Sequence, residues 1–91
     1  MKTLEPTTKF KKDLKKYKNK PDYLEELKKV LKLLENELPI PAEYKPHSLQ
    51  GDYKDCMECH IQGDFLLIWI DEVNNIIQLV RLGSHVELFG Q

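Results

Sequence analysis

Six consecutive apolar residues at Phe65–Ile70, FLLIWI, constrain the fold more than any other part of this sequence. A strand with one face in water alternates apolar and polar side chains, whereas a strand that is apolar throughout needs cover on both faces. The stretch therefore predicts a central strand. Further strands are expected at Met57–Ile61 and Ile76–Leu82, and Gln62-Gly63-Asp64 fits the tight turn of a hairpin before the central strand.

The remaining strands are expected at the margins of the sheet. Leu49–Asp55 could form a short strand and turn, and Met1–Glu5 could form an edge strand. Three prolines between residues 38 and 47 favour an extended connection, because proline lacks the backbone N–H that a helix needs. We expect a small, mainly antiparallel sheet of about four strands.

The first third of the chain has the period of helices. Pro6-Thr7-Thr8 supplies start signals, and Phe10, Leu14 and Tyr17 follow at i, i+4 and i+7, which predicts a helix with one narrow apolar stripe. The water-facing side of this helix is rich in lysine. Its lysines are Lys9, Lys11, Lys12, Lys15, Lys16 and Lys18.

A second helix is expected after Pro21. Asp22 and Glu25 have the spacing of a capping box, and a wider apolar face then runs to about Asn36. This face consists of Tyr23, Leu24, Leu27, Val30, Leu31 and Leu34. Two antiparallel helices joined by a short turn make a helical hairpin that would pack on the sheet. The prediction is one α+β domain over residues 1–91, with one hydrophobic core.

The capping-box spacing occurs again near the C-terminus, at Ser84 and Glu87. Gly83 ends the last predicted strand, and Ser84–Phe89 is expected to form one helical turn. His85 would be the first residue of that turn.

Charge is unevenly distributed along the chain. Residues 1–34 carry eleven lysines and five acids, for a net charge of +6, whereas residues 35–91 have a net charge of −7. Such a lysine-rich segment can bind phosphate, or it can be a solvated helix face. No apolar run approaches the roughly 20 residues of a membrane span, and the N-terminal stretch lacks an apolar signal core. We therefore expect a cytoplasmic protein without a membrane partner.

All three histidines lie in two pieces of the chain, Tyr44–Ile70 and Arg81–Gly90. Histidine has an unperturbed pKa of about 6.5, so it can give or take a proton near neutral pH. His47 precedes the predicted sheet, His60 lies at the end of one strand and His85 follows another. Strand ends on one side of a small sheet can converge, which predicts a shared site for acid–base chemistry.

Three other residues are candidates for the same site. Asp64 could orient one imidazole, or it could be an ordinary turn residue after His60. Arg81 could bind a phosphate bidentately or pair with an acid of the sheet. Phe89 could stack on a base or fill the core. The sequence contains no P-loop, no G-x-G-x-x-G motif and no carboxylate cluster of a two-metal site, so metal-free proton transfer is the chemistry it supports.

The run Cys56-Met57-Glu58-Cys59-His60 matches the C-x-x-C-H pattern of covalent haem attachment. We expect neither haem nor structural zinc, since an export signal and a second cysteine pair are both missing. On a strand, Cys56 and Cys59 would point to opposite faces about 10 Å apart, which is too far for a disulfide or a shared metal. Free thiols and no cofactor are therefore expected.

The motifs taken together resemble those of a known family. H-S-L-Q-G at His47–Gly51, E-C-H-I-Q-G-D-F at Glu58–Phe65 and R-L-G-S-H-V-E-L-F-G at Arg81–Gly90 are similar, in this order and spacing, to the YafQ branch of the RelE toxin superfamily. The likeness extends to F-K-K-D-L in the first helix and to L-P-I-P-A-E-Y-K before His47. It spans nearly the whole chain and implies a RelE-like fold.

The resemblance implies a bacterial type II toxin, an endoribonuclease that enters the ribosomal decoding site and cuts the messenger there. It also implies a cognate antitoxin that blocks this entry. The family's active-site positions fall on His47, His60, Asp64, His85 and Phe89, and Arg81 matches a basic position near the scissile phosphate. His47 or His60, with Asp64, would be the general base and His85 the general acid, while lysines of the two helices would contact ribosomal RNA.

Two other functions remain compatible with the sequence. The first is a catalytically silent RNA- or protein-binding module of the same fold. The second is a metal or haem protein that uses Cys56, Cys59 and His60.

Overall fold

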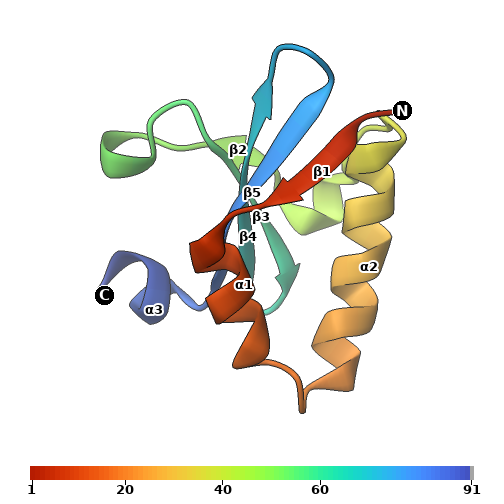
Figure 1. The fold of residues 1–91 in the computed structure, drawn as a ribbon. Coiled ribbons are helices and arrows are strands. Elements are labelled where there is room, and N and C mark those ends of the chain that lie inside the picture. Colours follow the sequence, from red (N-terminus) through yellow and green to blue (C-terminus); the bar gives the residue numbers. More distant parts are fainter. Residues whose placement is uncertain (91) are drawn as a thin grey trace.

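A twisted five-stranded sheet forms the centre of the computed structural model, which describes residues 1–90 (Figure 1). The strands are β1 (Thr3–Pro6), β2 (His47–Ser48), β3 (Met57–Gln62), β4 (Phe65–Glu72) and β5 (Ile76–Gly83). Their order across the sheet is β1-β5-β4-β3-β2. β1 pairs in parallel with β5, and all other neighbouring strands are antiparallel.

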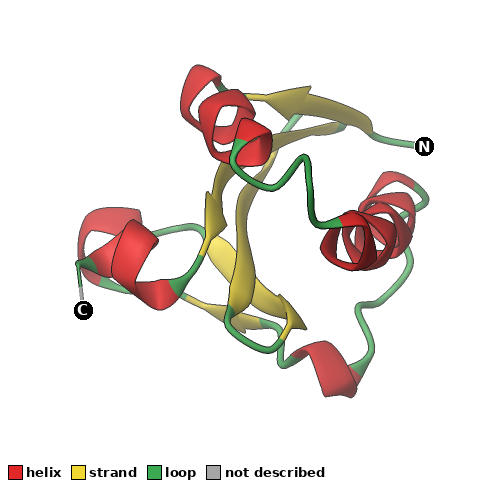
Figure 2. Ribbon diagram, turned by 90° about the horizontal axis from the view of Figure 1, so that it is seen from below, coloured by secondary structure: helices red, strands yellow, loops and turns green. Residues whose placement is uncertain are grey.

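Within the described residues, three α-helices accompany the sheet: α1 (Thr8–Lys15), α2 (Pro21–Glu35) and α3 (His85–Phe89). α1 and α2 run antiparallel, and α2 and α3 lie on opposite sides of the sheet (Figure 2). Two short 3₁₀ turns, at Ala42–Tyr44 and Gly51–Tyr53, lie in the connection between α2 and β3. None of the helices within residues 1–90 combines the length and the apolar character that crossing a bilayer requires.

β4 is the central strand that the FLLIWI stretch predicts. Phe65, Leu67 and Trp69 join a core cluster with side chains of α1 and α2. Leu66 and Ile68 point to the other face, where they pack against α3. All five side chains are at most 4% exposed. Because fully burying a side chain of this size contributes about 1.5–3 kcal/mol, β4 holds both layers of the molecule together.

The predicted α+β class is confirmed, but the sheet has five strands, because Thr3–Pro6 pairs along β5 and His47–Ser48 along β3. Of the short strand and turn expected in Leu49–Asp55, the strand was wrong and the turn is present, beginning with the 3₁₀ turn at Gly51–Tyr53. Gly51 and Asp55 have φ values of +70° and +73°, and this left-handed backbone interrupts an extended strand.

The helix starts agree with the sequence at two of three positions. The Thr7 side chain accepts a hydrogen bond from the Phe10 N–H and caps α1. Ser84 and Glu87 form both halves of a capping box at α3. The capping box predicted from Asp22 was wrong, because α2 begins at Pro21 and has no side-chain cap. Proline has no N–H to leave unpaired in the first turn of a helix, so it can take the first position itself.

Candidate active site

The three histidines meet in one cluster on the face of the sheet that α3 covers. The register of β2 on β3 pairs His47 with Glu58, and His60 lies two residues further along β3. His47, Glu58 and His60 therefore point to the same face of the sheet. The ring centroids are 6.2 Å apart for His47 and His60, and 5.8 Å apart for His60 and His85. The structure therefore brings together the imidazoles that the sequence singled out.

The transition from β5 into α3 determines where His85 lies. Gly83 has a φ of +155°, and a Cβ atom at this position would come within 2.7 Å of the Glu87 Oε1. Glu87 occupies this space to accept a hydrogen bond from the Ser84 N–H at 2.9 Å. The chain thus turns directly from the last strand into a helix whose first residue is His85.

Asp64 binds His85 rather than the other two histidines. Its Oδ1 lies 2.5 Å from the His85 Nδ1 and accepts the His85 backbone N–H at 3.1 Å. These hydrogen bonds lower the pKa of Asp64 below its ordinary value. The sequence paired Asp64 with His47 or His60, and the structure differs because Leu66 of β4 lies opposite Gly83 of β5. This register sets the residues before β4 beside the start of α3.

Glu58 is a residue of the cluster that the sequence analysis did not select. It is 2% exposed, and its Oε1 lies 3.1 Å from the His47 Nε2 and 3.9 Å from the His60 Nε2. Its Oε2 is buried and has no hydrogen-bond partner within residues 1–90. The sequence did contain a signal for it, because an acid two residues before a histidine on a strand shares its face.

Both ring nitrogens of His47 are engaged. Nδ1 lies 2.8 Å from the carbonyl oxygen of Lys45, which can only accept, so Nδ1 carries a proton. Nε2 faces the Glu58 carboxylate. In this arrangement His47 has no free ring nitrogen to offer a substrate.

Arg81 pairs with an acid of α1 rather than with one of the sheet. Its Nε donates to Asp13 Oδ2 at 2.7 Å and its Nη2 donates to Asp13 Oδ1 at 3.1 Å. Asp13 is 4% exposed and also accepts the Leu82 backbone N–H. The hydrogen bonds to Asp13 raise the pKa of Arg81. The edge formed by Nε and Nη2 is therefore occupied, and Nη1 on the other side donates to the Tyr53 hydroxyl at 3.3 Å.

Phe89 lies at the border between the core and the histidine cluster. Its ring packs edge-on against Tyr53 at 5.6 Å between centroids and lies 6.0 Å from the His85 ring. The side chain is half-buried. It therefore fills part of the small core under α3 and also presents an aromatic edge beside His85.

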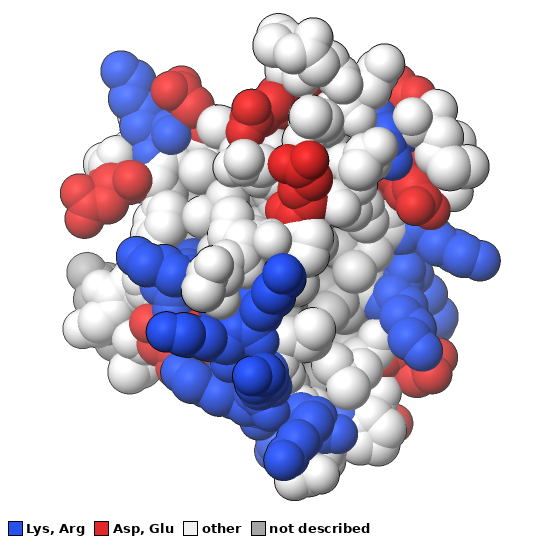
Figure 3. Space-filling model, viewed as in Figure 1, with Lys and Arg blue, Asp and Glu red and all other residues white. Residues whose placement is uncertain are grey.

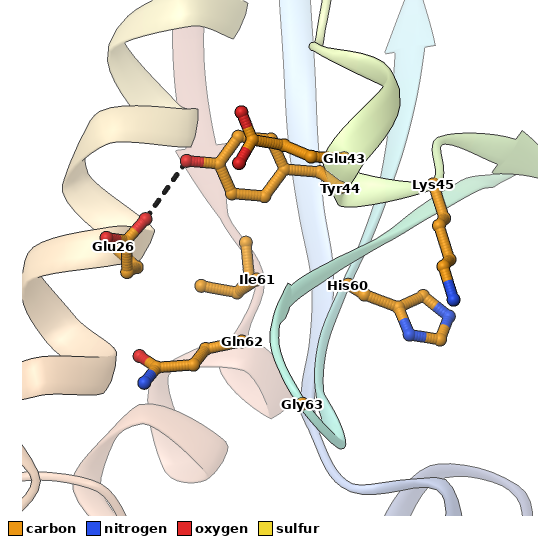
Figure 4. A pocket seen from close by; sticks show the side chains of 8 residues that line it. All are labelled: Glu26, Glu43, Tyr44, Lys45, His60, Ile61, Gln62 and Gly63. Atoms are coloured by element: carbon orange, nitrogen blue, oxygen red, sulfur yellow. Dashed lines mark hydrogen bonds between the residues drawn. The ribbon is translucent and has the colours of Figure 1, made fainter.

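A polar hollow of about 430 Å³ borders His60 (Figure 4). Residues of α2, of the Ala42–Tyr44 turn and of β3 form its walls. The Tyr44 hydroxyl donates to the Glu26 carboxylate at 3.0 Å on one side, and the Lys45 amine lies on the side of His60. This hollow is the open space next to the cluster.

Three ligand atoms of the cluster are close enough to meet one cation. They belong to Glu58, His60 and His85, and all lie within 4.8 Å of one another. The cysteines are not part of this group. Cys56 and Cys59 are free and buried, they belong to the two different core clusters on opposite faces of the sheet, and burial raises the pKa of Cys59 to about 12.

Positive charge gathers on the helices. Lys and Arg side chains cover the exposed side of α1, and a second group follows α2 (Figure 3). Lys9 and Lys12 of α1, with Lys16 directly after it, line a hollow of about 290 Å³ that reaches Asp13 and Arg81. A basic surface thus extends from α1 toward the strand that leads to His85.

The fold places the chain in a class of protein, since the solved structures that match it include toxins from bacteria. YafQ from E. coli, solved in complex with DinJ, has a TM-score of 0.84 at 33% identity, and the match covers 99% of this chain and 100% of that one. A metal-bound toxin from Helicobacter pylori has a TM-score of 0.88 at 44% identity and covers 98% and 100% of the two chains.

The chain belongs to the YafQ family. The family model described as "Bacterial toxin of type II toxin-antitoxin system, YafQ" matches residues 2–90. The mRNA interferase toxin YafQ of E. coli strain K12 is 34% identical over 88 residues, which cover 96% of this chain and 95% of that protein. The predicted family and toxin class are confirmed, and the predicted enzyme class, an endoribonuclease, is confirmed by this relative.

Proposed function

We propose that this toxin is a metal-independent endoribonuclease that cuts mRNA on the ribosome by histidine acid–base catalysis and is inhibited by a cognate antitoxin. The observation that carries the proposal is the cluster of three imidazoles, whose neighbouring rings are 6.2 and 5.8 Å apart. The name of the E. coli relative, an mRNA interferase toxin, supports mRNA as the substrate. The complex of E. coli YafQ with DinJ supports an antitoxin partner.

RNA supplies its own nucleophile, so the protein has only to move protons. A general base takes the proton of a 2′-hydroxyl, and the resulting oxyanion attacks the adjacent phosphorus. A general acid protonates the departing 5′-oxygen, which leaves a 2′,3′-cyclic phosphate and a 5′-hydroxyl. Each positioned proton transfer is typically worth about 10²–10⁴-fold in rate.

His85 is the residue best placed to be the general acid. Asp64 accepts from its Nδ1 at 2.5 Å, so this nitrogen is the donor within the pair. The Nε2 atom is then free to deliver a proton to the leaving oxygen. The His85 side chain is 48% exposed, which gives a bound phosphate access to it.

His60 is the best candidate for the general base. The sequence left this role open between His47 and His60, and both ring nitrogens of His47 are engaged by Lys45 and Glu58. The His60 Nε2 is 3.9 Å from the Glu58 carboxylate, beyond hydrogen-bond distance. This nitrogen is therefore free to accept a proton. The Glu58 carboxylate is still close enough to stabilise the positive charge that His60 would acquire during the reaction.

Arg81 and Phe89 would hold the substrate. Asp13 occupies the bidentate edge of Arg81, so the guanidinium would act on the phosphate through its charge and its Nη1 atom. Phe89 lies 6.0 Å from the His85 ring and could stack on a base next to the cut. The lysines of α1 and α2 would contact ribosomal RNA through its phosphates.

Replacing His85 tests the proposal. In a cell-free translation system, the wild-type toxin should cut a translated message and leave an untranslated one intact, and His85→Ala should cut about 10²–10⁴-fold more slowly. Val86→Ala is the matched control, because this residue of the same helix is 63% exposed. A folded His85→Ala protein that cuts at the wild-type rate would rule out the mechanism.

A catalytically silent RNA- or protein-binding module of the same fold is the second candidate. It predicts that the antitoxin-free wild-type protein cuts neither message. The same experiment therefore distinguishes the two functions.

A further inference from the structure

We propose that Tyr17, which lies outside the histidine cluster, is a positioning residue for the Asp64–His85 pair and acts through Glu87. The inference rests on the proposed function of this pair. It identifies a residue in the turn after α1 on which the reaction would depend, although Tyr17 contacts neither histidine.

The Asp64–His85 pair needs support from elsewhere in the molecule. The two side chains are 58% and 48% exposed, so packing does not hold them directly. His85 begins a helix of only five residues. Isolated helices shorter than about 12–15 residues are marginal in water, so the position of α3 depends on its contacts with the rest of the chain.

The Tyr17 hydroxyl supplies one of these contacts. It donates a hydrogen bond to the Glu87 Oε1. The same oxygen accepts the Ser84 backbone N–H at 2.9 Å, so a single carboxylate oxygen connects the start of α3 to the turn after α1. The hydrogen bond from Tyr17 is also the main cause that lowers the pKa of Glu87. Glu87 follows His85 by two residues, and Tyr17 therefore restrains α3 close to its catalytic side chain.

The ring of Tyr17 reaches the other half of the pair. It packs against Phe65 at 4.6 Å between ring centroids, and Phe65 directly follows Asp64. Phe65 is 1% exposed and belongs to the larger core cluster. Tyr17 thus contacts the neighbour of Asp64 with its ring and restrains the helix of His85 with its hydroxyl. No other aromatic residue within residues 1–90 joins these two segments in this way.

Loss of the hydroxyl would release α3 without disturbing the core. Phenylalanine keeps the ring on Phe65 but cannot donate to Glu87. Because a misplacement of about 1 Å at a reacting group can cost about 10²-fold in rate, we expect Tyr17→Phe to lower the cleavage rate about 10-fold. The toxin concentration that gives half the maximal rate should change little, since Tyr17 would not touch the RNA at the cut.

The matched control is Tyr23→Phe. The Tyr23 ring stacks on the same Phe65 at 4.7 Å, and its hydroxyl makes no hydrogen bond in the part of the chain that the structure describes. Single-turnover cleavage of a message on ribosomes should be measured for both variants over a range of toxin concentrations. We expect the wild-type rate for Tyr23→Phe and a lower maximal rate for Tyr17→Phe. Equal rates for the two variants would overturn the proposal.

A double variant separates positioning through Glu87 from a general loss of stability. In a Glu87→Ala background, the additional change Tyr17→Phe should have no further effect on the maximal rate. Independent, additive effects would contradict a pathway through Glu87.

A spectroscopic readout does not depend on cleavage. The ring signals of His85 in NMR spectra should shift in Tyr17→Phe and stay in place in Tyr23→Phe. Unchanged His85 signals in Tyr17→Phe would overturn the positioning role even if the rate fell. Suppose that His85→Ala leaves cleavage intact, while the His85 signals still shift in the separate Tyr17→Phe variant. The proposed function then fails, and the positioning role of Tyr17 stands.

Discussion

Under α1 and α2 the sheet buries a cluster of twelve residues, whereas under α3 it buries a cluster of four. The first surface is called here the helix-covered face and the second the site face. Alternate residues of the same strands build both. On β3, Cys59 and Ile61 enter the core of the helix-covered face, while Glu58 and His60 point to the site face. The period of two thus separates the residues for stability from those for chemistry.

The difference explains how a chain of 91 residues can keep polar groups in its interior. The helix-covered face supplies most of the buried apolar surface, which is the main favourable term in folding. The site face can then contain a buried carboxylate with an unpartnered oxygen, an arrangement that costs free energy. Core substitutions on the helix-covered face should therefore lower mainly stability. Core substitutions on the site face should lower mainly activity.

The largest effect on stability is expected from Leu67→Ala on the helix-covered face. Leu67 is fully buried on the central strand, and removal of such a side chain costs about 2–5 kcal/mol of unfolding free energy through lost burial and the cavity left behind. Urea unfolding followed by circular dichroism measures this. The molecules that remain folded should cut RNA at the wild-type rate. A stable variant with lost cleavage would break the separation of the two faces.

Leu88→Ala on the site face should cost less stability and more activity. Leu88 belongs to the cluster of four and is the buried residue of α3, so its loss should cost about 2 kcal/mol, near the lower limit for such changes. Cleavage should fall further than the folded fraction does, because the helix that carries His85 loses its anchor. Val86→Ala serves as the control on the same helix, since it should change neither quantity.

The smallest effect on stability is expected from protonation of Asp64 in acid. Hydrogen bonds to His85 lower the pKa of Asp64 in the folded state, so the charged carboxylate contributes stability that is present above its unfolded pKa of about 3.9. This contribution is lost as the pH falls through the lower, folded-state pKa. The difference in unfolding free energy between wild type and Asp64→Asn should therefore shrink as the pH falls below about 5. A difference that instead grew below pH 5 would contradict the hydrogen bonds to His85.

Local patterns were sufficient to predict much of the fold. The apolar run at Phe65–Ile70 predicted the central strand, and the capping box at Ser84 predicted the start of α3. These features depend on neighbours within a few residues, so the sequence contains them directly. The capping box predicted from Asp22 was wrong because two helix-start signals overlap in this segment. Pro21 took the first helical position, and the helix has no side-chain cap.

The identity of the candidate site residues was also within reach of the sequence, but their partners were not. Asp64 binds His85 across 21 positions, and Arg81 binds Asp13 across 68. The spacing of Glu58 and His60 places both on one face of a strand, but nothing in the immediate neighbours of Glu58 shows that His47 lies opposite it. Contacts of this kind depend on strand register and on how α1 and α3 pack, which no local pattern specifies.

The sequence by itself determined that this chain folds as helices on a sheet with three histidines available for proton transfer. Only the tertiary structure decided that Asp64 serves His85, that Glu58 lies between His47 and His60, and that Asp13 occupies the bidentate edge of Arg81. The physical reason is that hydrophobic periodicity fixes which face a side chain takes, whereas its partner on that face depends on the register of strands that pair after the chain has collapsed.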